Sequence, residues 1–169
     1  MRLRIGRWTI EHDPDATRAC YARIPEGPAC APCPSCENYI ALREGDLPAE
    51  FWKLLDTLGI AFAKPAELCL AEPAAGQWVN YSLWYHFVGR IISGADCWKP
   101  TSETFSMYDG EKIAPNLSLG FSSRRELVND AFAADSIVQL EVVVNAPWVL
   151  NIFSHPYYEP WFEALNRES

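Results

Sequence analysis

The sequence predicts an α+β protein with a mostly antiparallel β-sheet system, two short helices in the N-terminal third and a cysteine-bearing loop. The first third contains two segments in which apolar residues recur at helical spacing, whereas after Pro65 they alternate as in β-strands. No internal repeat or linker divides the chain. Of its 169 residues, 49% are hydrophobic, which is enough for one core. We therefore expect a single domain over residues 1–169.

Two helices are expected before residue 60. The first begins near Cys36, in the segment CENYIALRE. The second lies in DLPAEFWKLLDTLG, where Asp46 offers a capping oxygen, Pro48 suits the first turn and Gly59 can end the helix. Apolar residues lie on one side of this second helix, at Phe51, Trp52, Leu54, Leu55 and Leu58. This spacing predicts a helix that packs into the core.

The longest expected strand starts at Gln77, in the run QWVNYSLWYHFVGRII. Both of its faces carry bulky apolar side chains, so we expect it to be central in the sheet. We favour two strands with a bend near Gly89 over one long strand. Further strands are expected at residues 3–10, 67–70, 103–107, 117–122 and 137–145. One helical turn is expected in SRRELVNDAF, and a short closing helix in the tail HPYYEPWFEALNR.

Charge and hydropathy exclude some classes of protein. The formal net charge is -8, and an acidic surface repels phosphate groups, so we expect neither nucleic-acid binding nor docking to anionic membranes. No apolar run approaches the roughly 20 residues that cross a bilayer. The start, MRLRIGRWTIEHD, lacks the apolar region of a secretory signal. We expect a cytoplasmic protein, in a compartment where clustered cysteines more often bind metal than form disulfides.

Four of the six cysteines lie in the stretch CYARIPEGPACAPCPSCENYI. A C-x-x-C spacing can place two sulfurs around a zinc ion, with bonds of roughly 2.3 Å. The stretch belongs to a proline-rich segment, residues 11–36, which we expect to be a loop that needs a cross-link. We predict one closed, structural zinc site formed by Cys20, Cys30, Cys33 and Cys36. Cys20 enters by elimination, and His12 is an alternative fourth ligand.

Two other interpretations of the cysteines stay open. The C-x-x-C-x-x-C spacing also begins the ferredoxin pattern, which next requires a cysteine where this chain has Ile40, so an iron–sulfur cluster would depend on Cys20. Cys30 and Cys33, in CAPC, are similar to the redox pair of thioredoxins, although that motif normally follows a core strand. The other two cysteines, Cys69 and Cys97, are expected to be small core or half-buried side chains.

A separate candidate site involves His86 and Glu141. His86 shares a strand face with Arg90, and Glu141 can approach from the strand at 137–145. Such a cluster can perform acid/base catalysis, but it is more often a buried polar network in which the carboxylate pairs with the arginine. We expect His86 to be neutral, at least partly buried and hydrogen-bonded. His155 is expected to be a capping or surface residue.

Several stretches, CPSCENYIAL, LLDTLGI, KPAEL, WYHFVGRI and VQLEVVVNAPWVL, resemble a family of uncharacterised bacterial proteins of similar length, over about residues 30–150. The resemblance implies one domain with a cysteine-bearing turn before a helix, and it implies no activity.

Two functions remain. The favoured one is a non-catalytic zinc module that binds an unknown protein or small molecule through exposed aromatic residues. The candidates for that surface are Trp78, Trp84, Tyr85, Trp148 and Trp161. The alternative is an enzyme that uses Cys30 and Cys33, a metal cluster, or His86 and Glu141.

Overall fold

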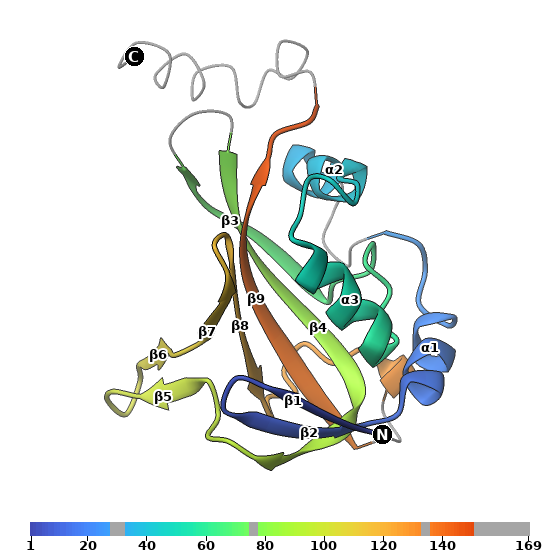
Figure 1. The fold of residues 1–169 in the computed structure, drawn as a ribbon, viewed down its shortest axis with the longest axis vertical. Helices are drawn as coiled ribbons and strands as arrows, with labels where there is room; N and C mark the ends of the chain where they lie inside the picture. The colour runs from blue at the N-terminus through green and yellow to red at the C-terminus, as the bar shows by residue number, and fades with distance from the viewer. Residues whose placement is uncertain (28–32, 75–77, 133–135, 151–169) are drawn as a thin grey trace.

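A computed structural model describes residues 1–27, 33–74, 78–132 and 136–150. It contains a seven-stranded sheet with three α-helices along one side and a small hairpin on the other (Figure 1). Every strand pairing among these residues is antiparallel. The predicted α+β class with a mostly antiparallel sheet is therefore confirmed. None of the helices in the described ranges is long and apolar enough to cross a membrane.

The sheet has the order β1-β2-β4-β9-β8-β7, with β3 also paired to β4. Its strands are β1 (Arg2–Ile5), β2 (Trp8–His12), β3 (Glu67–Ala74), β4 (Trp78–Ser93), β7 (Glu111–Ala114), β8 (Leu117–Ser122) and β9 (Ile137–Pro147). A separate hairpin joins β5 (Trp98–Pro100) and β6 (Ser106–Tyr108). The strand expected at residues 103–107 is thus displaced to β6, and β5 and β7 were not predicted.

Strand β4 is central, as predicted. It pairs with β9 along one edge, while β3 and β2 share the other edge in succession. It runs through Gly89 without interruption, so the preferred division into two strands is wrong and the alternative of one long strand is confirmed. Gly89 is needed for another reason: a Cβ there would lie 2.3 Å from the Glu11 carbonyl oxygen, so only glycine allows β2 to approach.

Helix α1 (Pro14–Tyr21) corrects the prediction that residues 11–36 form one loop. Asp13 caps it by accepting hydrogen bonds from the backbone of residues 15 and 16, and Pro14 occupies its first turn. The helix closes the gap between β2 and β3 on the edge of β4. There Val88 N donates to Thr17 Oγ1 at 3.0 Å, and Tyr21 Oη donates to the His86 carbonyl at 2.9 Å. Its hydrogen bonds to β4 therefore favour the helix over a loop.

Helices α2 (Pro34–Ala41) and α3 (Ala49–Leu58) match the two predicted helices. α2 begins two residues before Cys36, with Cys33 as its N-cap. α3 ends at Gly59, whose φ of 75° is the left-handed conformation expected there. Asp46 does not cap α3, because its carboxylate instead accepts from Arg43 N at 2.7 Å.

The two faces of the sheet differ. The inner face, under the helices, is formed by Val79, Tyr81, Leu83, Tyr85, Phe87, Leu140, Val142 and Val144, all of them buried. The outer face is formed by the alternate residues Ser82, Trp84, His86, Gln139, Glu141 and Val143. The β5–β6 hairpin and the segment 123–132 lie over the outer face.

Smaller differences concern the ends of the chain. The single strand expected at 3–10 is a hairpin of β1 and β2, because Gly6 adopts a φ of 52° that permits a tight turn. The helical turn expected near residue 130 is present at Asp130–Phe132. The expected closing helix, His155 and Trp161 lie outside the described residues.

Candidate functional site

Two of the four predicted zinc ligands lie together at the start of α2. The sulfurs of Cys33 and Cys36 are 3.1 Å apart, and Cys36 N donates to Cys33 Sγ at 3.4 Å. Around a zinc ion with bonds of roughly 2.3 Å, two thiolates are separated by about 3.8 Å. Cys36 is only 3% exposed, but Cys33 is half-buried, so a small side-chain rotation of Cys33 would open the pair to that separation. The pair fits a zinc ion.

The other predicted ligands are not seen beside this pair. Cys20 is buried on α1, where Arg23 Nη2 donates to its sulfur at 3.5 Å, and Cys30 lies outside the described residues. Within the described ranges, no three His, Cys, Asp or Glu side chains gather to hold a metal ion. The four-cysteine site and its iron–sulfur and redox alternatives therefore stay predictions. His12, the alternative fourth ligand, is on β2, which lies at the opposite end of the molecule from α2 (Figure 1), and its role likewise stays a prediction.

The last two cysteines differ from each other. Cys97 is fully buried, as expected. Cys69 is exposed, which corrects its assignment as a core or half-buried residue. It lies on β3, whose one strand partner within the described ranges is β4, so its side chain is left at the edge of the outer face.

A buried chain of hydrogen bonds crosses the outer face. His86 Nε2 lies 2.9 Å from Gln139 Oε1, and Gln139 Nε2 donates to Glu141 Oε1 at 2.5 Å. Ser122 Oγ donates to the same carboxylate oxygen at 3.2 Å. Because the amide nitrogen of Gln139 is directed at Glu141, its oxygen faces His86, and His86 therefore carries its proton on Nε2. Nδ1 is left as an acceptor, with no hydrogen bond from a described residue.

This chain differs from the predicted cluster in one member. Arg90 does not join His86 and Glu141, because it forms an ion pair with Glu11 at 2.5 Å. The reason is the change of partner along β4, which places Arg90 opposite Glu11 of β2. Gln139 takes the bridging position instead, and it was missed although it is the direct cross-strand partner of His86.

Burial sets the charge states of the two ionisable groups. It lowers the pKa of His86, against a smaller opposing effect of Gln139. It raises the pKa of Glu141, against the hydrogen bond from Gln139, the nearby donors of Trp98 and Ser122, and the charge of Arg124. His86 is 2% exposed and hydrogen-bonded, which confirms these two parts of the prediction, and its lowered pKa favours the neutral ring at pH 7.

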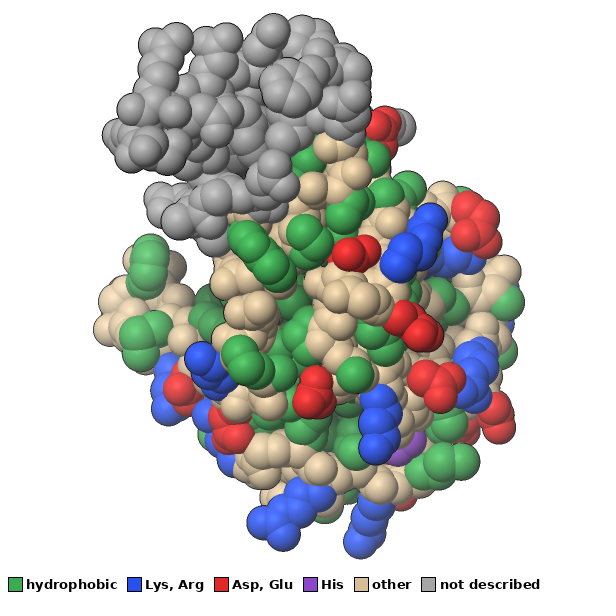
Figure 2. All heavy atoms as spheres, turned by 45° about the horizontal axis from the view of Figure 1, so that its top comes forward, with side chains coloured by type: hydrophobic (Ala, Val, Ile, Leu, Met, Phe, Trp, Pro, Cys, Tyr) green, Lys and Arg blue, Asp and Glu red, His purple; other side chains and the backbone are tan. Residues whose placement is uncertain are grey.

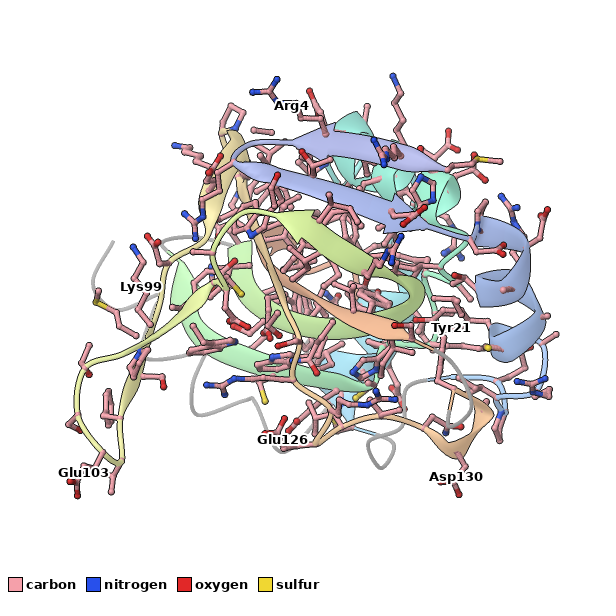
Figure 3. All side chains as sticks on the ribbon, turned by 90° about the horizontal axis from the view of Figure 1, so that it is seen from below. Arg4, Tyr21, Lys99, Glu103, Glu126 and Asp130 are labelled. Carbon is pink, nitrogen blue, oxygen red and sulfur yellow. The ribbon has the colours of Figure 1, made fainter. Side chains whose placement is uncertain are left out.

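A cavity of about 290 Å³ lies beside His86. Its walls include Tyr21, Val128 and Phe132, and Figure 3 shows Tyr21 on the same side of the molecule as the segment that carries Glu126 and Asp130. Lys64 also lines the cavity, but its ammonium donates to the Tyr21 carbonyl at 3.2 Å and to the Ile24 carbonyl at 2.9 Å. These two hydrogen bonds of Lys64 therefore hold the backbone at the end of α1 and just after it.

A second cavity, of about 130 Å³, lies between the outer face and the β5–β6 hairpin. Trp84 and Glu141, direct cross-strand partners, line it from the sheet, and Trp98 and Tyr108, also cross-strand partners, line it from the hairpin. The rings of Trp98 and Tyr108 are tilted by 56° with centroids 5.5 Å apart. Lys99, labelled in Figure 3, marks the hairpin next to Trp98.

Two of the residues that line this second cavity each have a buried polar atom without a partner among the described residues: Trp98 Nε1 and Tyr108 Oη. The Trp98 N–H is near enough to lower the pKa of Glu141, and Ser118 is near enough to lower that of Tyr108, but neither contact has hydrogen-bond geometry. Within the described part of the chain, both polar groups therefore lack a hydrogen-bond partner.

The aromatic residues proposed for binding divide between core and surface. Tyr85 is fully buried on the inner face and Trp148 is buried, so both belong to the core. Trp78 is 41% exposed, and Trp84 is half-buried on the outer face. Only Trp78 and Trp84, among the candidates that the structure describes, are open to a ligand.

On the face of the molecule in Figure 2, acidic and basic side chains are interspersed and form no single-sign patch. The chain matches no protein-family model, no curated protein and no solved structure.

Proposed function

We propose that this protein is a non-catalytic zinc-binding module whose sheet binds a ligand. The observation that supports the zinc site is the contact between the Cys33 and Cys36 sulfurs, 3.1 Å apart at the start of α2. The N-terminal end of a helix carries a partial positive charge, which favours thiolates over thiols. Two thiolates in the first turn of α2 are therefore a suitable half of a zinc site.

Cys20 and Cys30 are the proposed remaining ligands. A set of four thiolates leaves no open position on zinc, so the ion would have a structural role. Cys20 belongs to α1 and the Cys33–Cys36 pair to α2, so the ion would link these two helices. Zinc binding contributes about 10–16 kcal/mol in small zinc-finger peptides, which is enough to order the intervening segment. The cytoplasm, as a reducing compartment, would keep these thiols available for the metal.

Elemental analysis of purified protein tests this proposal. We expect one zinc ion per chain, its loss in Cys33→Ser and Cys36→Ser, and its retention in Cys69→Ser, the matched control because Cys69 is an exposed cysteine on β3. Limited proteolysis should then cut the metal-free variants between α1 and α2. Iron with a brown colour would contradict the proposal in favour of a cluster, and a metal-free protein with a reversible Cys30–Cys33 disulfide would favour redox chemistry.

A second candidate function, acid/base catalysis by His86, is supported by the hydrogen bonds that fix its tautomer. With its proton on Nε2, His86 has a basic Nδ1 and lines the cavity of about 290 Å³. Hydrolysis of 4-nitrophenyl acetate tests it. This function predicts turnover that His86→Gln abolishes and His12→Gln leaves unchanged. Equal rates in all three proteins would exclude a base at His86.

A further inference from the structure

The smaller cavity, under the β5–β6 hairpin, combines aromatic walls with a buried carboxylate. Trp84, Trp98 and Tyr108 supply three rings, and Glu141 supplies the acid. At about 130 Å³ the cavity is below the usual 300–1,000 Å³ of sites for drug-sized ligands. It suits a single small group, such as one end of a ligand or a compact molecule.

Glu141 has no counter-charge in direct contact among the described residues. It is 3% exposed and forms no ion pair with a described residue, and its hydrogen bonds from Ser122 and Gln139 both end on Oε1. Oε2 receives none from the described part of the chain. A buried carboxylate without an ion pair is costly, so a cation bound next to Oε2 would offset that cost.

The aromatic walls of the cavity also favour a positively charged ligand. The faces of tryptophan and tyrosine rings attract cations, most strongly where water is excluded. One cation of the protein already packs against these rings: the Arg124 guanidinium lies 4.7 Å from the centroid of the Trp98 ring. Two other basic groups of the region are paired with carboxylates, since Lys99 and Arg7 form ion pairs with Asp109 at 2.6 and 3.0 Å and Arg7 also lies 3.8 Å from Glu111. The net charge of -8 also favours the approach of cations.

The two unpartnered polar atoms, Trp98 Nε1 and Tyr108 Oη, place a further requirement on the ligand. The N–H of Trp98 donates to no described acceptor, and the Tyr108 hydroxyl has no described partner. An oxygen close to the cationic centre of a ligand would satisfy both, whereas a purely hydrocarbon substituent would leave them unpaired.

We propose that this cavity binds a small methylated ammonium compound that carries an oxygen near its cationic centre. Trp84, Trp98 and Tyr108 surround the ammonium group, and Glu141 Oε2 is its counter-charge. This inference gives a chemical class to the ligand-binding part of the proposed function and rests on that part, but it does not depend on the zinc site.

Titration with choline, followed by tryptophan fluorescence, tests the inference. We use tetramethylammonium as the probe without oxygen and 3,3-dimethylbutan-1-ol as the neutral isostere of choline, at constant ionic strength. We expect choline to bind best, tetramethylammonium next, and the neutral alcohol at least about tenfold more weakly than choline, because it loses both the ring and the carboxylate attraction. Equal affinity for choline and the alcohol, or no binding of choline, would overturn the inference.

Variants locate the site. Glu141→Gln keeps the shape and should weaken choline binding roughly tenfold, and Trp84→Leu should do so as well. Arg124→Gln should strengthen it, because a competing and repelling cation is removed. Trp78→Leu is the control, since Trp78 lies on the same strand but does not line the cavity. Unchanged affinity in folded Glu141→Gln and Trp84→Leu would overturn the assignment.

The two proposals fail separately. A metal-free wild-type protein that still binds choline overturns the zinc site alone. A zinc-loaded protein that does not bind choline overturns the cation site alone.

Discussion

The inner and outer faces of the sheet are built from the same two strands, β4 and β9, yet the layers that cover them differ in how fully their polar groups are paired. On the inner face, Tyr85 Oη donates to the Phe62 carbonyl at 2.8 Å and accepts from Tyr39 Oη. On the outer face, by contrast, the Tyr108 hydroxyl beside Glu141 is buried without a described partner.

The contrast indicates different roles for the two faces. Burial of apolar and fully paired groups stabilises the fold, whereas a buried charge and unpaired donors destabilise it. Proteins retain such destabilising groups mainly where a function requires them. We therefore infer that the inner face stabilises the domain and the outer face provides its binding site.

Two adjacent valines test the difference in packing. Val142 is buried on the inner face, while Val143 is half-buried on the outer face and lines the smaller cavity. We expect Val142→Ala to lower the free energy of unfolding by about 2 kcal/mol, and Val143→Ala by less than about 1 kcal/mol, because its surroundings are already partly empty. Urea unfolding of both variants measures this, and equal losses would remove the distinction.

The same change at two tyrosines tests the difference in pairing. Tyr85→Phe leaves the Phe62 carbonyl and the Tyr39 hydroxyl unpaired, so it should cost about 1–2 kcal/mol of unfolding free energy. Tyr108→Phe removes a hydroxyl that has no described partner, and it should leave stability unchanged or raise it slightly. A Tyr108→Phe protein destabilised as much as Tyr85→Phe would show that the outer hydroxyl is paired after all.

The state of His86 gives a smaller, spectroscopic test. Burial lowers its pKa from 6.5, so the folded protein binds this proton less tightly than the unfolded chain does. The stability linked to His86 is therefore present above pH 6.5 and is lost as the pH falls toward the folded pKa. ¹⁵N NMR should show a neutral ring protonated on Nε2 at pH 7. A ring protonated on Nδ1 would refute the Gln139 bridge.

Sequence patterns predicted the regular parts of the fold and missed those set by distant contacts. Strand β8 has the predicted bounds, and the central place of β4 followed from its two apolar faces. Helix α1 was missed because prolines dominate its neighbourhood, although Asp13 and Pro14 form a recognisable helix start. The hairpin strands β5 and β6 are only three residues each, too short for periodicity to reveal.

The candidate sites show the same limit. The nearness of Cys33 and Cys36 follows from their spacing at a helix start. Arg90, in contrast, was assigned to Glu141 because the register that places it opposite Glu11 depends on which strand pairs with β4. The cavity under the hairpin joins Trp98 and Tyr108 to Glu141, and no local pattern connects residues so far apart in sequence.

We infer that the outer face retains a buried carboxylate, Glu141, that serves binding and destabilises the fold. The stability of Glu141→Gln as a function of pH tests this inference most directly. Burial raises the pKa of Glu141 above 4.5, so the folded state holds this proton more tightly than the unfolded state. Wild-type stability linked to Glu141 must then fall as the pH rises through the folded pKa, and the neutral glutamine avoids that loss. We predict that Glu141→Gln is more stable than wild type at pH 7, with the difference vanishing below pH 4.5. A variant less stable than wild type at pH 7 would contradict this, since Glu141 would then be a stabilising part of the fold.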